Sequence, residues 1–424
     1  MVSPLRIAVI GAGWAGLAAA VEATLRGRVV TLFDMAPRAG GRARGVWVDD
    51  QLLDNGQHIA IGAYVELLRL MHRVGVSPEQ AFARIPLALL DAHGVGLQLH
   101  PGKPATALGL AIARHPSWRW RDKFDLIRAS LGWAMAGFEC APSLDVATLT
   151  RDLPMPIRLE LIDPLCIAAL NTPAHQASAS VFLRILRDAL LSGPGSSDLL
   201  LPRVPLSQVF PEPALHWLEH QGAALRLATR VMVVKAHANA WQVDGEHFDA
   251  VVVATSPAEA ARLVEPIAEK WADSTRSLRY EPIVTVYMRS PGTQLPGPML
   301  ALRADARHPA QFVFDRGQLG GATGLLAFVI SGAQSWVDAG TDATVDATQT
   351  QAQVELGGLL RAPLETVSVL TEKRATFRCT PLLRRPPVAV ANQFVAAGDY
   401  VDGPYPATLE GAVRSGVCAI SKLG

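Results

Sequence analysis

Short runs of consecutive apolar residues near the start of the chain predict buried strands on either side of a buried helix. Residues 7–10 (IAVI) and 29–33 (VVTLF) are runs of strand length, and residues 17–21 (LAAAV) lie between them. Strands that are buried on both faces read as such runs, whereas half-exposed strands alternate. A helix between two such strands is typical of a parallel crossover unit. The beginning of the chain therefore predicts an α/β fold.

The same patterns continue along the chain. Residues 249–255 form another apolar run that stops near a proline, and residues 64–74 show helical spacing. Further strands are expected at 46–49, 52–54, 225–234, 240–243, 283–288, 325–330 and 393–397, and further helices at 214–221 and 344–360. Together these elements predict a Rossmann-like domain with an interleaved α+β domain.

The length of 424 residues exceeds one typical domain, so two domains are expected. Residues 84–198 differ from the preceding part because they are punctuated by prolines, rich in tryptophan and mostly helical in pattern. We expect the Rossmann-like domain to comprise residues 1–83, 199–274 and 391–424. The substrate domain then comprises residues 84–198, which are mostly helical, and residues 275–390, which form a sheet with helices.

A dinucleotide-binding motif follows the first strand. It has the pattern Gly-x-Gly-x-x-Gly, and Asp34 ends the second strand 23 residues after the first glycine. The first glycine permits a tight turn, the second lets a pyrophosphate approach the helix N-terminus, and the third lets helix and strand pack closely. An acid at this distance can accept hydrogen bonds from a ribose diol, which a merely structural glycine turn would not explain. The residues expected to contact the dinucleotide here are Gly11, Gly13, Trp14, Ala15, Gly16 and Asp34.

Gly40, Gly41 and Arg42 follow this acid closely. A NAD dehydrogenase does not require two glycines and an arginine at this place. The stretch resembles one in flavoproteins of the amine oxidase and phytoene desaturase type. That resemblance implies packing against the diphosphate of FAD, with charge-assisted hydrogen bonds from the arginine. The alternative is a glycine-rich loop with a solvated arginine.

A third motif lies near the C-terminus. Gly398 and Asp399 end an expected strand, and a helix is expected to begin near Thr408. An acid at a strand end can reach the ribityl and pyrophosphate region of a flavin dinucleotide, and the N–H groups at a helix start favour negative charge. Ala407 is expected to contact the cofactor as well. Because three separated motifs then share one ligand, the N- and C-terminal segments must meet.

The charge balance argues against a nucleic-acid-binding protein, because the chain has 39 basic and 38 acidic residues and such proteins usually carry a basic excess. Charged residues make up 18% of the chain, below the usual ~25%, which suits an apolar interior, an apolar substrate cavity or a membrane-contacting face. The four cysteines are scattered, so neither a metal site nor a disulfide framework is expected. With no run of membrane-spanning length and no signal peptide, we expect a cytoplasmic protein, soluble or peripheral.

Four stretches resemble the hydroxysqualene dehydroxylase family, within the FAD-dependent amine oxidase and phytoene desaturase superfamily. They are Asp54-Asn55-Gly56-Gln57-His58 and residues 372–377 (EKRATF), 397–399 (AGD) and 406–416 (PATLEGAVRSG). The first two discriminate the family, whereas the other two belong to the superfamily at large. One departure is residues 400–405, which read Tyr-Val-Asp-Gly-Pro-Tyr where the family pattern is Trp-Thr-Asp-Thr-Gly-Leu. Because this loop borders the flavin, the departure bears on the exact substrate and rate.

The resemblance implies a non-covalent FAD cofactor and a hydrophobic isoprenoid substrate. It implies that Gly56, Gln57 and His58 lie beside the flavin and that a strand near Val231 lends backbone groups to the adenine. The implied reaction removes the hydroxyl group of hydroxysqualene to give squalene, in hopanoid or squalene synthesis. Because the chain has no second complete Gly-x-Gly-x-x-Gly, electrons would come from transiently bound NADPH or from a separate reductase.

This reaction needs a proton donor, since an allylic hydroxyl leaves as water, and a dry pocket with groups that stabilise cationic charge. His58 is the first candidate donor because it lies in the segment expected beside the flavin. A hydrogen bond to the cofactor is its alternative role. Tyr400, Asp402 and Tyr405 are further candidates.

Three other functions stay open. A carotenoid or phytoene desaturase would use the same fold in the opposite redox direction. An amine oxidase is less favoured because no aromatic cage is evident near the C-terminal helix, although Tyr400 and Tyr405 keep it open. A flavin-free isoprenoid carrier of this fold would have no need for residues such as Gly13, Asp34 and Asp399.

Residues 118–138 form a candidate membrane-docking segment. Aromatic residues and cations alternate in residues 118–123 (WRWRDK), which suits the headgroup region of a bilayer. The alternative is a helix of the substrate domain that is buried against its own core. With docking, the protein would be peripheral on the inner face of the cytoplasmic membrane. The apolar positions that recur at helical spacing are Phe124, Ile127, Leu131, Ala134 or Met135, and Phe138.

Overall fold

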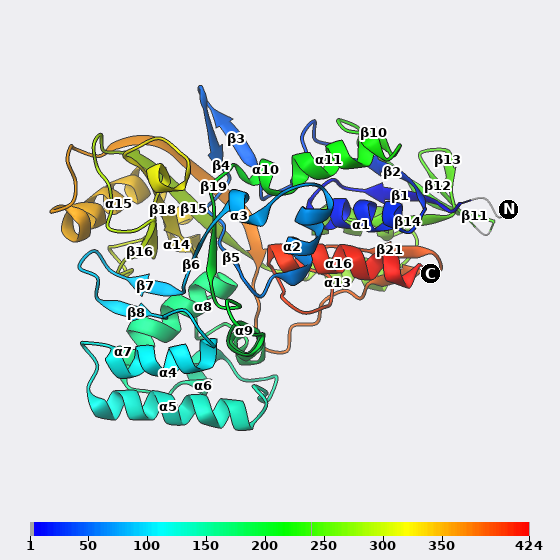
Figure 1. Ribbon diagram of the computed structural model, residues 1–424. Helices are drawn as coiled ribbons and strands as arrows, with labels where there is room; N and C mark the ends of the chain where they lie inside the picture. The colour runs from blue at the N-terminus through cyan, green and yellow to red at the C-terminus, as the bar shows by residue number, and fades with distance from the viewer. Residues whose placement is uncertain (1–3, 239, 424) are drawn as a thin grey trace.

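A six-stranded sheet organises one side of the molecule in the computed structural model, which describes residues 4–238 and 240–423 (Figure 1). The strand order is β10-β2-β1-β14-β21-β20, and all neighbours are parallel except β21 and β20. The strands are β1 (Arg6–Ile10), β2 (Val29–Phe33), β10 (Ala224–Arg226), β14 (Ala250–Val253), β20 (Ala389–Ala391) and β21 (Phe394–Ala396). Three distant parts of the chain therefore build one sheet.

Two helices with many small residues, α1 (Trp14–Leu25) and α16 (Leu409–Lys422), pack side by side against this sheet (Figure 1). Nearly all of α1 is buried, and α11 (Pro211–His220) also lies against it. Gly416 of α16 is so close to α1 that a Cβ at this position would collide with the carbonyl oxygen of Ala15. The small residues thus bring the N- and C-terminal segments together at backbone distance.

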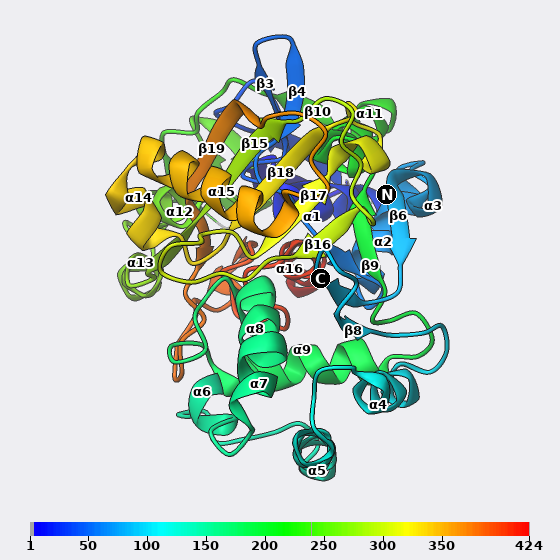
Figure 2. The same ribbon diagram turned by 90° about the vertical axis from the view of Figure 1, so that its left-hand side faces the viewer.

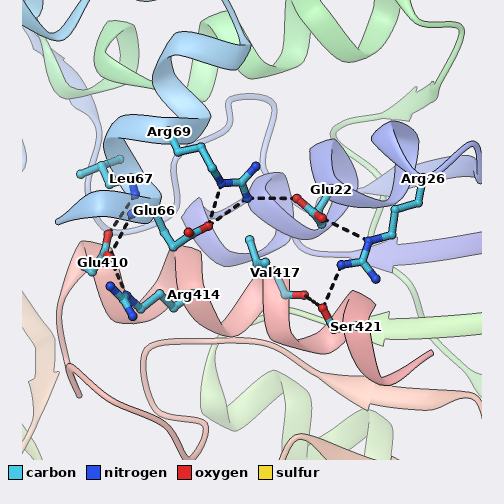
Figure 3. A network of polar contacts seen from close by, with 9 residues as sticks. All are labelled: Glu22, Arg26, Glu66, Leu67, Arg69, Glu410, Arg414, Val417 and Ser421. Atoms are coloured by element: carbon cyan, nitrogen blue, oxygen red, sulfur yellow. Dashed lines mark hydrogen bonds and ion pairs between the residues drawn. The ribbon is translucent and has the colours of Figure 1, made fainter. Parts of the chain in front are cut away.

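A network of polar contacts ties α16 to α1 and to α2 (Val65–Arg73) (Figure 3). Glu410 is fully buried and accepts hydrogen bonds from the backbone N–H groups of Glu66, at 3.1 Å, and Leu67, at 2.9 Å. Its carboxylate also pairs with Arg414 at 2.6 Å. The first N–H groups of a helix have no partner within the helix, so Glu410 caps α2 and complements its dipole.

Replacement of Glu410 by alanine is expected to lower the free energy of unfolding by about 3 kcal/mol, at the low end for a broken buried ion pair because Arg414 keeps some access to water. Arg69→Ala, in the exposed part of the same network, is expected to cost about 0–1 kcal/mol, since its ion pairs with Glu22 and Glu66 are solvated. Urea unfolding followed by circular dichroism measures both. Equal losses would mean that Glu410 is no better shielded from water than Arg69.

The expected strand at 225–234 is wrong. β10 ends at Arg226, and β11 (Val234–His237) begins a separate antiparallel sheet with β12 (Ala240–Val243) and β13 (Glu246–Phe248). Between the two sheets Ala228 is left-handed, with φ 52°, and the N–H of Thr229 donates to the backbone oxygen of Asp34 at 2.7 Å. Val231 of this segment lines a cavity and the neighbouring Met232 and Val233 are exposed, so the apolar run does not mark a strand here.

A five-stranded antiparallel sheet of order β16-β17-β18-β15-β19 forms a second layer (Figure 2). One of its faces packs, through Val284, Val286 and Met288, in a cluster with α14 (Gln334–Ala339) and α15 (Thr341–Leu356). On the other face, Ile283, Phe314 and Val329 are among the residues that line the cavity. The strands are β15 (Tyr280–Arg289), β16 (Met299–Ala301), β17 (Phe312–Asp315), β18 (Leu325–Ile330) and β19 (Glu365–Phe377).

A layer of helices closes the other side of the cavity, and both views show α5 as its outermost member (Figures 1 and 2). The layer consists of α4 (Pro104–Arg114), α5 (Trp120–Met135), α6 (Val146–Leu149), α7 (Met155–Ile157), a π-helical turn (Arg158–Ile162), α8 (Asp163–Leu170) and α9 (Ala179–Leu191). The remaining elements are β3 (Gly45–Val48), β4 (Gln51–Asp54), β5 (Ala60–Ile61), α3 (Pro78–Ala81), β6 (Phe82–Ile85), β7 (Ala88–Leu90), β8 (Gly96–Gln98), β9 (Leu199–Pro202), α10 (Leu206–Val209), α12 (Pro257–Val264), α13 (Glu269–Arg276) and a 3₁₀ turn (Arg316–Leu319).

The expected membrane-docking face is wrong for part of residues 118–138. Trp118 is 5% exposed, its Nε1 donates to Glu160 at 2.7 Å, and its ring stacks on His115. Phe138 is also buried, and Ile127 is half-buried. The helix carries apolar residues on two sides, and periodicity alone does not tell which side packs inward.

Candidate active site

A cavity of about 810 Å³ lies between the two sheets and the helical layer. We call one end the polar part, which is lined by residues from the motif segments 10–15, 33–43, 55–58, 229–231, 254–259, 398–400 and 405–408. The other end is the apolar part, which is lined by residues between 87 and 199 and by the facing side of the antiparallel sheet. Ligands in the two parts would share one continuous space.

The three glycines of the first motif differ in what surrounds them. Gly11 has φ +113°, and a Cβ there would collide with the backbone of Ala254 in the neighbouring segment. A Cβ at Gly16 would collide with the carbonyl oxygen of Gly11. A Cβ at Gly13, in contrast, would meet no atom within 4 Å. Gly11 and Gly16 are therefore required by the fold, whereas Gly13 keeps space free inside the cavity.

Asp34 holds the turn at the end of β2 through both carboxylate oxygens. The backbone N–H of Ala12 donates to Oδ2 at 2.6 Å, and the N–H of Ala36 donates to Oδ1 at 2.7 Å. Each oxygen retains further accepting capacity toward the cavity that Asp34 lines. Val231 lines the same end and is buried, with its carbonyl oxygen bound by Arg262 at 2.7 Å.

Arg42 connects three segments. Its guanidinium pairs with Asp399 at 2.5 Å and donates to the carbonyl oxygens of Ala375, at 2.8 Å, and Arg374, at 3.2 Å. The preceding Gly40 and Gly41 have φ +104° and +59°, which glycine adopts without strain. The loop is fastened to α1 because the indole Nε1 of Trp14 donates to the carbonyl oxygen of Ala43 at 2.8 Å. The Gly-Gly-Arg loop and the C-terminal acid thus form one unit.

The two stretches that discriminate the family contact each other. Asn55 Nδ2 donates to the carbonyl oxygen of Arg42 at 3.0 Å and to Oε2 of Glu372 at 3.2 Å. Nε2 of Gln57 donates to the hydroxyl of Tyr287 at 2.7 Å, and Oε1 of Gln57 accepts a hydrogen bond from Arg316 at 3.1 Å. These contacts fix the backbone of residues 55–58 along the cavity wall. The side-chain amide of Gln57 makes its hydrogen bonds to Tyr287 and Arg316 of the protein.

Sequence reasoning missed three residues of this unit: Glu372, Tyr287 and Arg316. Glu372 opens the stretch 372–377 and lines the cavity, so the resemblance of that stretch was a usable signal. Tyr287 lies within an ordinary strand pattern and Arg316 in a short turn, and neither has a local signal.

His58 lines the cavity with one ring nitrogen engaged. Its Nδ1 lies 3.1 Å from the carbonyl oxygen of Gly56 and donates to it. No hydrogen bond to Nε2 occurs in the described part of the chain, so Nε2 is the atom available to a ligand. Burial lowers the pKa of His58, and the positive charge of Arg42 acts in the same direction. The neutral imidazole is therefore the major form at pH 7, and the imidazolium fraction grows as the pH falls.

Tyr400 presents an unpaired hydroxyl in the cavity. It is 1% exposed, and its hydroxyl has no hydrogen-bond partner among residues 4–238 and 240–423. A Cβ on Gly398 would collide with the Tyr400 ring, so this glycine permits the position of the tyrosine. Burial raises the pKa of Tyr400, which keeps the hydroxyl protonated as a donor.

Tyr405 also lines the cavity, but its hydroxyl is hydrogen-bonded to Asp188 of α9. Its ring packs edge-on against Tyr64 at 6.0 Å. Asp402 does not reach the main cavity. Its side chain is 71% exposed, pairs with Arg385 at 3.3 Å and borders a separate pocket of about 330 Å³. Of the additional donor candidates, the structure brings Tyr400 and Tyr405 to the cavity and leaves Asp402 outside it.

The start of α16 faces the cavity through Ala407 and Thr408. Ala407 is left-handed, with φ 57°, and Thr408 is the N-cap, whose hydroxyl accepts from the N–H of Gly411 at 2.9 Å. The two residues therefore set where the helix begins relative to the cavity.

The polar part fits a flavin dinucleotide. No side chain caps the N-terminus of α1 in the described residues, which leaves its first N–H groups to a pyrophosphate. The space above Gly13 and the unpaired hydroxyl of Tyr400 are consistent with a bound group. Asp34 and Val231 would hold the adenosine end, Gly13 and Arg42 the diphosphate region, and residues 56–58, 398–400 and 407–408 the isoalloxazine end.

The apolar part carries no charged side chain among the described residues between 87 and 199 that line it. Its walls are leucine, isoleucine, alanine, phenylalanine and tryptophan, with a few small polar residues such as Ser130 and Asn171. Burial of a charged group without a partner is costly, so this part favours an uncharged apolar ligand.

Two further observations bear on the chemistry. In residues 4–238 and 240–423, no group of three or more His, Cys, Asp or Glu side chains could hold a metal ion. Within the same ranges, none of the helices combines the length and apolar character needed to cross a membrane.

Comparison with known proteins shows similarity along nearly the whole chain. The family model described as flavin containing amine oxidoreductase matches residues 14–419. Hydroxysqualene dehydroxylase of Rhodopseudomonas palustris is 29% identical over 96% of this chain and 96% of its own length, and that of Sinorhizobium fredii is 28% identical over 97% of each. A solved oxidoreductase structure from Methanosarcina mazei superposes with a TM-score of 0.72 at 13% identity, covering 99% of this chain and 100% of the other. These similarities confirm the predicted fold class and the family resemblance seen in the sequence.

Proposed function

This chain belongs to the family of flavin-containing amine oxidoreductases and is an FAD-dependent oxidoreductase, and from this premise we propose that it converts hydroxysqualene to squalene. The observation that carries the proposal is the cavity itself. Its polar part fits a flavin dinucleotide, and its apolar part, whose lining residues between 87 and 199 carry no charged group, continues directly from it. The names of the two relatives point to the same substrate.

An amine substrate is less well supported. A protonated amine would lie against the lining residues between 87 and 199, which include no carboxylate, and this is unfavourable. Tyr405 donates to Asp188 and packs edge-on against Tyr64, so it is engaged with protein groups. The cavity suits a hydrocarbon chain better than a cation.

The proposed reaction replaces one hydroxyl by one hydrogen and releases water, which requires two electrons and a proton for the leaving hydroxyl. Bound FAD supplies the hydride chemistry. The chain must exclude water, hold the allylic alcohol and donate the proton. Nε2 of His58 and the hydroxyl of Tyr400 both lie at the polar part of the cavity and have no described protein partner.

We assign the proton to His58 in its imidazolium form. Its Nδ1 stays fixed on the carbonyl oxygen of Gly56, so protonation occurs at Nε2, toward the cavity. Tyr400 stays protonated and donates a hydrogen bond to the leaving oxygen. The dry apolar wall prevents water from capturing the allylic cation before reduction.

The source of electrons and the location complete the proposal. Electrons come from transiently bound NADPH or from a separate reductase, since the described fold has one dinucleotide motif of this kind, on β1 and α1. We place the protein on the inner face of the cytoplasmic membrane, where its substrate is dissolved.

Anaerobic incubation of the reduced enzyme with hydroxysqualene, with products identified by mass spectrometry, tests the proposal. We expect squalene at one equivalent per flavin reduced. Oxidation of squalene or phytoene, with hydroxysqualene left untouched under reducing conditions, would reverse the redox direction and support a desaturase. Oxidised enzyme incubated with hydroxysqualene is the control, because it lacks the electrons for the reaction.

A further inference from the structure

An apolar row lies on the outward side of α5, the outermost helix of the helical layer (Figures 1 and 2). Its members are Trp120, Phe124, Leu131 and Met135, which are 75%, 66%, 58% and 84% exposed. Spacings of four and seven residues place them on one side of the helix. Exposed apolar groups of this size in one contiguous row are typical of an interaction surface.

The same helix borders the apolar part of the cavity. Leu126 and Trp133 point inward and line it. Leu131 and Ala134 line the cavity and are also exposed, and so is Leu191 at the end of α9. Residues that belong to both surfaces mark the place where the cavity reaches the outside. The apolar row therefore lies beside this opening, which we call the cavity mouth.

Cations surround the row. Residues 114–135 contain four arginines and one lysine against two aspartates, and the lysine, Lys123, is buried with its Nζ donating to the carbonyl oxygen of Ala113 at 2.8 Å. Both aspartates are engaged locally: Asp122 accepts from the N–H of Arg119 at 3.2 Å, and Asp125 pairs with Arg128 at 3.4 Å. Arg119 and Arg121 are exposed at the start of the helix. The face thus combines apolar side chains with a net positive charge, as amphipathic surfaces that bind anionic lipid do.

We propose that the α5 face docks on a bilayer that contains anionic phospholipid, so that the cavity mouth opens directly into lipid. An isoprenoid then passes from the bilayer to the apolar part of the cavity without crossing water. The identity of this ligand rests on the proposed function, whereas the docking itself rests on the exposed row, the cavity mouth and the surrounding cations. Helix α5 carries apolar residues on two sides, and in this proposal the side that faces lipid is the one with Trp120 and Phe124.

Co-sedimentation with vesicles of phosphatidylcholine and phosphatidylglycerol, free of isoprenoid, tests the docking. We expect binding by the flavin-loaded protein, weaker binding to phosphatidylcholine alone, and weaker binding at high salt. The double variant Trp120→Ser, Phe124→Ser is expected to bind at least about tenfold more weakly because two side chains no longer leave water. Arg121→Glu, which removes no apolar surface, is expected to lose binding only to the anionic vesicles.

Trp47→Ser is the matched control. Trp47 is 56% exposed on the β3–β4 hairpin, which lies at the opposite end of the molecule from α5 in both views (Figures 1 and 2). This variant is expected to sediment like the wild type. Flavin content and melting temperature check that each variant is folded, and Arg121→Glu keeps the test valid if the double variant unfolds.

Unchanged sedimentation of both folded α5 variants would overturn the proposal. A wild type that is dimeric in gel filtration, becomes monomeric on Trp120→Ser, Phe124→Ser and does not bind vesicles would assign the face to a second copy of this chain instead. Because the vesicles hold no isoprenoid, a failure of hydroxysqualene turnover leaves this result intact. Where turnover is observed, the double variant should lose it with substrate in vesicles and keep it with substrate in detergent micelles.

Discussion

Gly13→Val is expected to give a folded protein that is purified without flavin. The Cβ at this position meets no atom within 4 Å, and the backbone angles of φ −75° and ψ 178° suit valine, so the fold itself loses little. The branched side chain would fill the space through which a pyrophosphate reaches the first N–H groups of α1. We expect affinity for FAD to fall at least ~100-fold, or ~2.7 kcal/mol. Flavin absorbance after gel filtration measures the loss.

Two other glycines separate a binding defect from a folding defect. Gly132→Val, on α5 outside the cavity lining, also meets no atom within 4 Å and is expected to retain flavin. Gly16→Val would force the side chain onto the carbonyl oxygen of Gly11 and is expected to be insoluble. Wild-type flavin content in Gly13→Val would show that the pyrophosphate of FAD does not bind at Gly13.

Sequence reasoning succeeded where a function depends on neighbouring residues. The turn at Gly11, the close approach at Gly16 and the acid at the end of β2 are set by local spacing, so the strand–helix–strand unit was predictable. The meeting of N- and C-terminal segments followed from three motifs that would serve one ligand. The two segments meet where Gly416 of α16 contacts Ala15 of α1, which the small residues on both helices allow.

Pairings across the chain could not be predicted in the same way. Asn55 and Glu372 are 317 positions apart, and Gln57 and Tyr287 are 230 apart, yet they fix the wall beside His58. No periodicity encodes such pairs, and only the resemblance of both stretches to one family hinted at a shared role. For α5, periodicity found the apolar residues but not which of its two apolar sides, that of Leu126 or that of Trp120, faces the core.

His58→Ala is expected to fold, to retain flavin and to lower turnover of hydroxysqualene by roughly 10²–10⁴-fold, the range for a lost general acid. The donor must be the imidazolium, and burial lowers the pKa of His58 below its ordinary value of 6.5. The protonated fraction therefore grows as the pH falls and is small above pH 7. Wild-type turnover should accordingly decline as the pH rises through the lowered pKa.

The pH profile distinguishes a proton donor from a residue that only positions the cofactor. In His58→Ala turnover should be slow at every pH, and its decline with rising pH should vanish, because no group with the pKa of His58 remains to donate the proton. His72→Ala, on the exposed side of α2, is the control and should keep the wild-type profile. A wild-type rate that is flat with pH in the neutral range, and a His58→Ala variant that is slower but equally flat, would make His58 a cofactor contact. The donor role would then pass to Tyr400, whose raised pKa predicts such a flat rate.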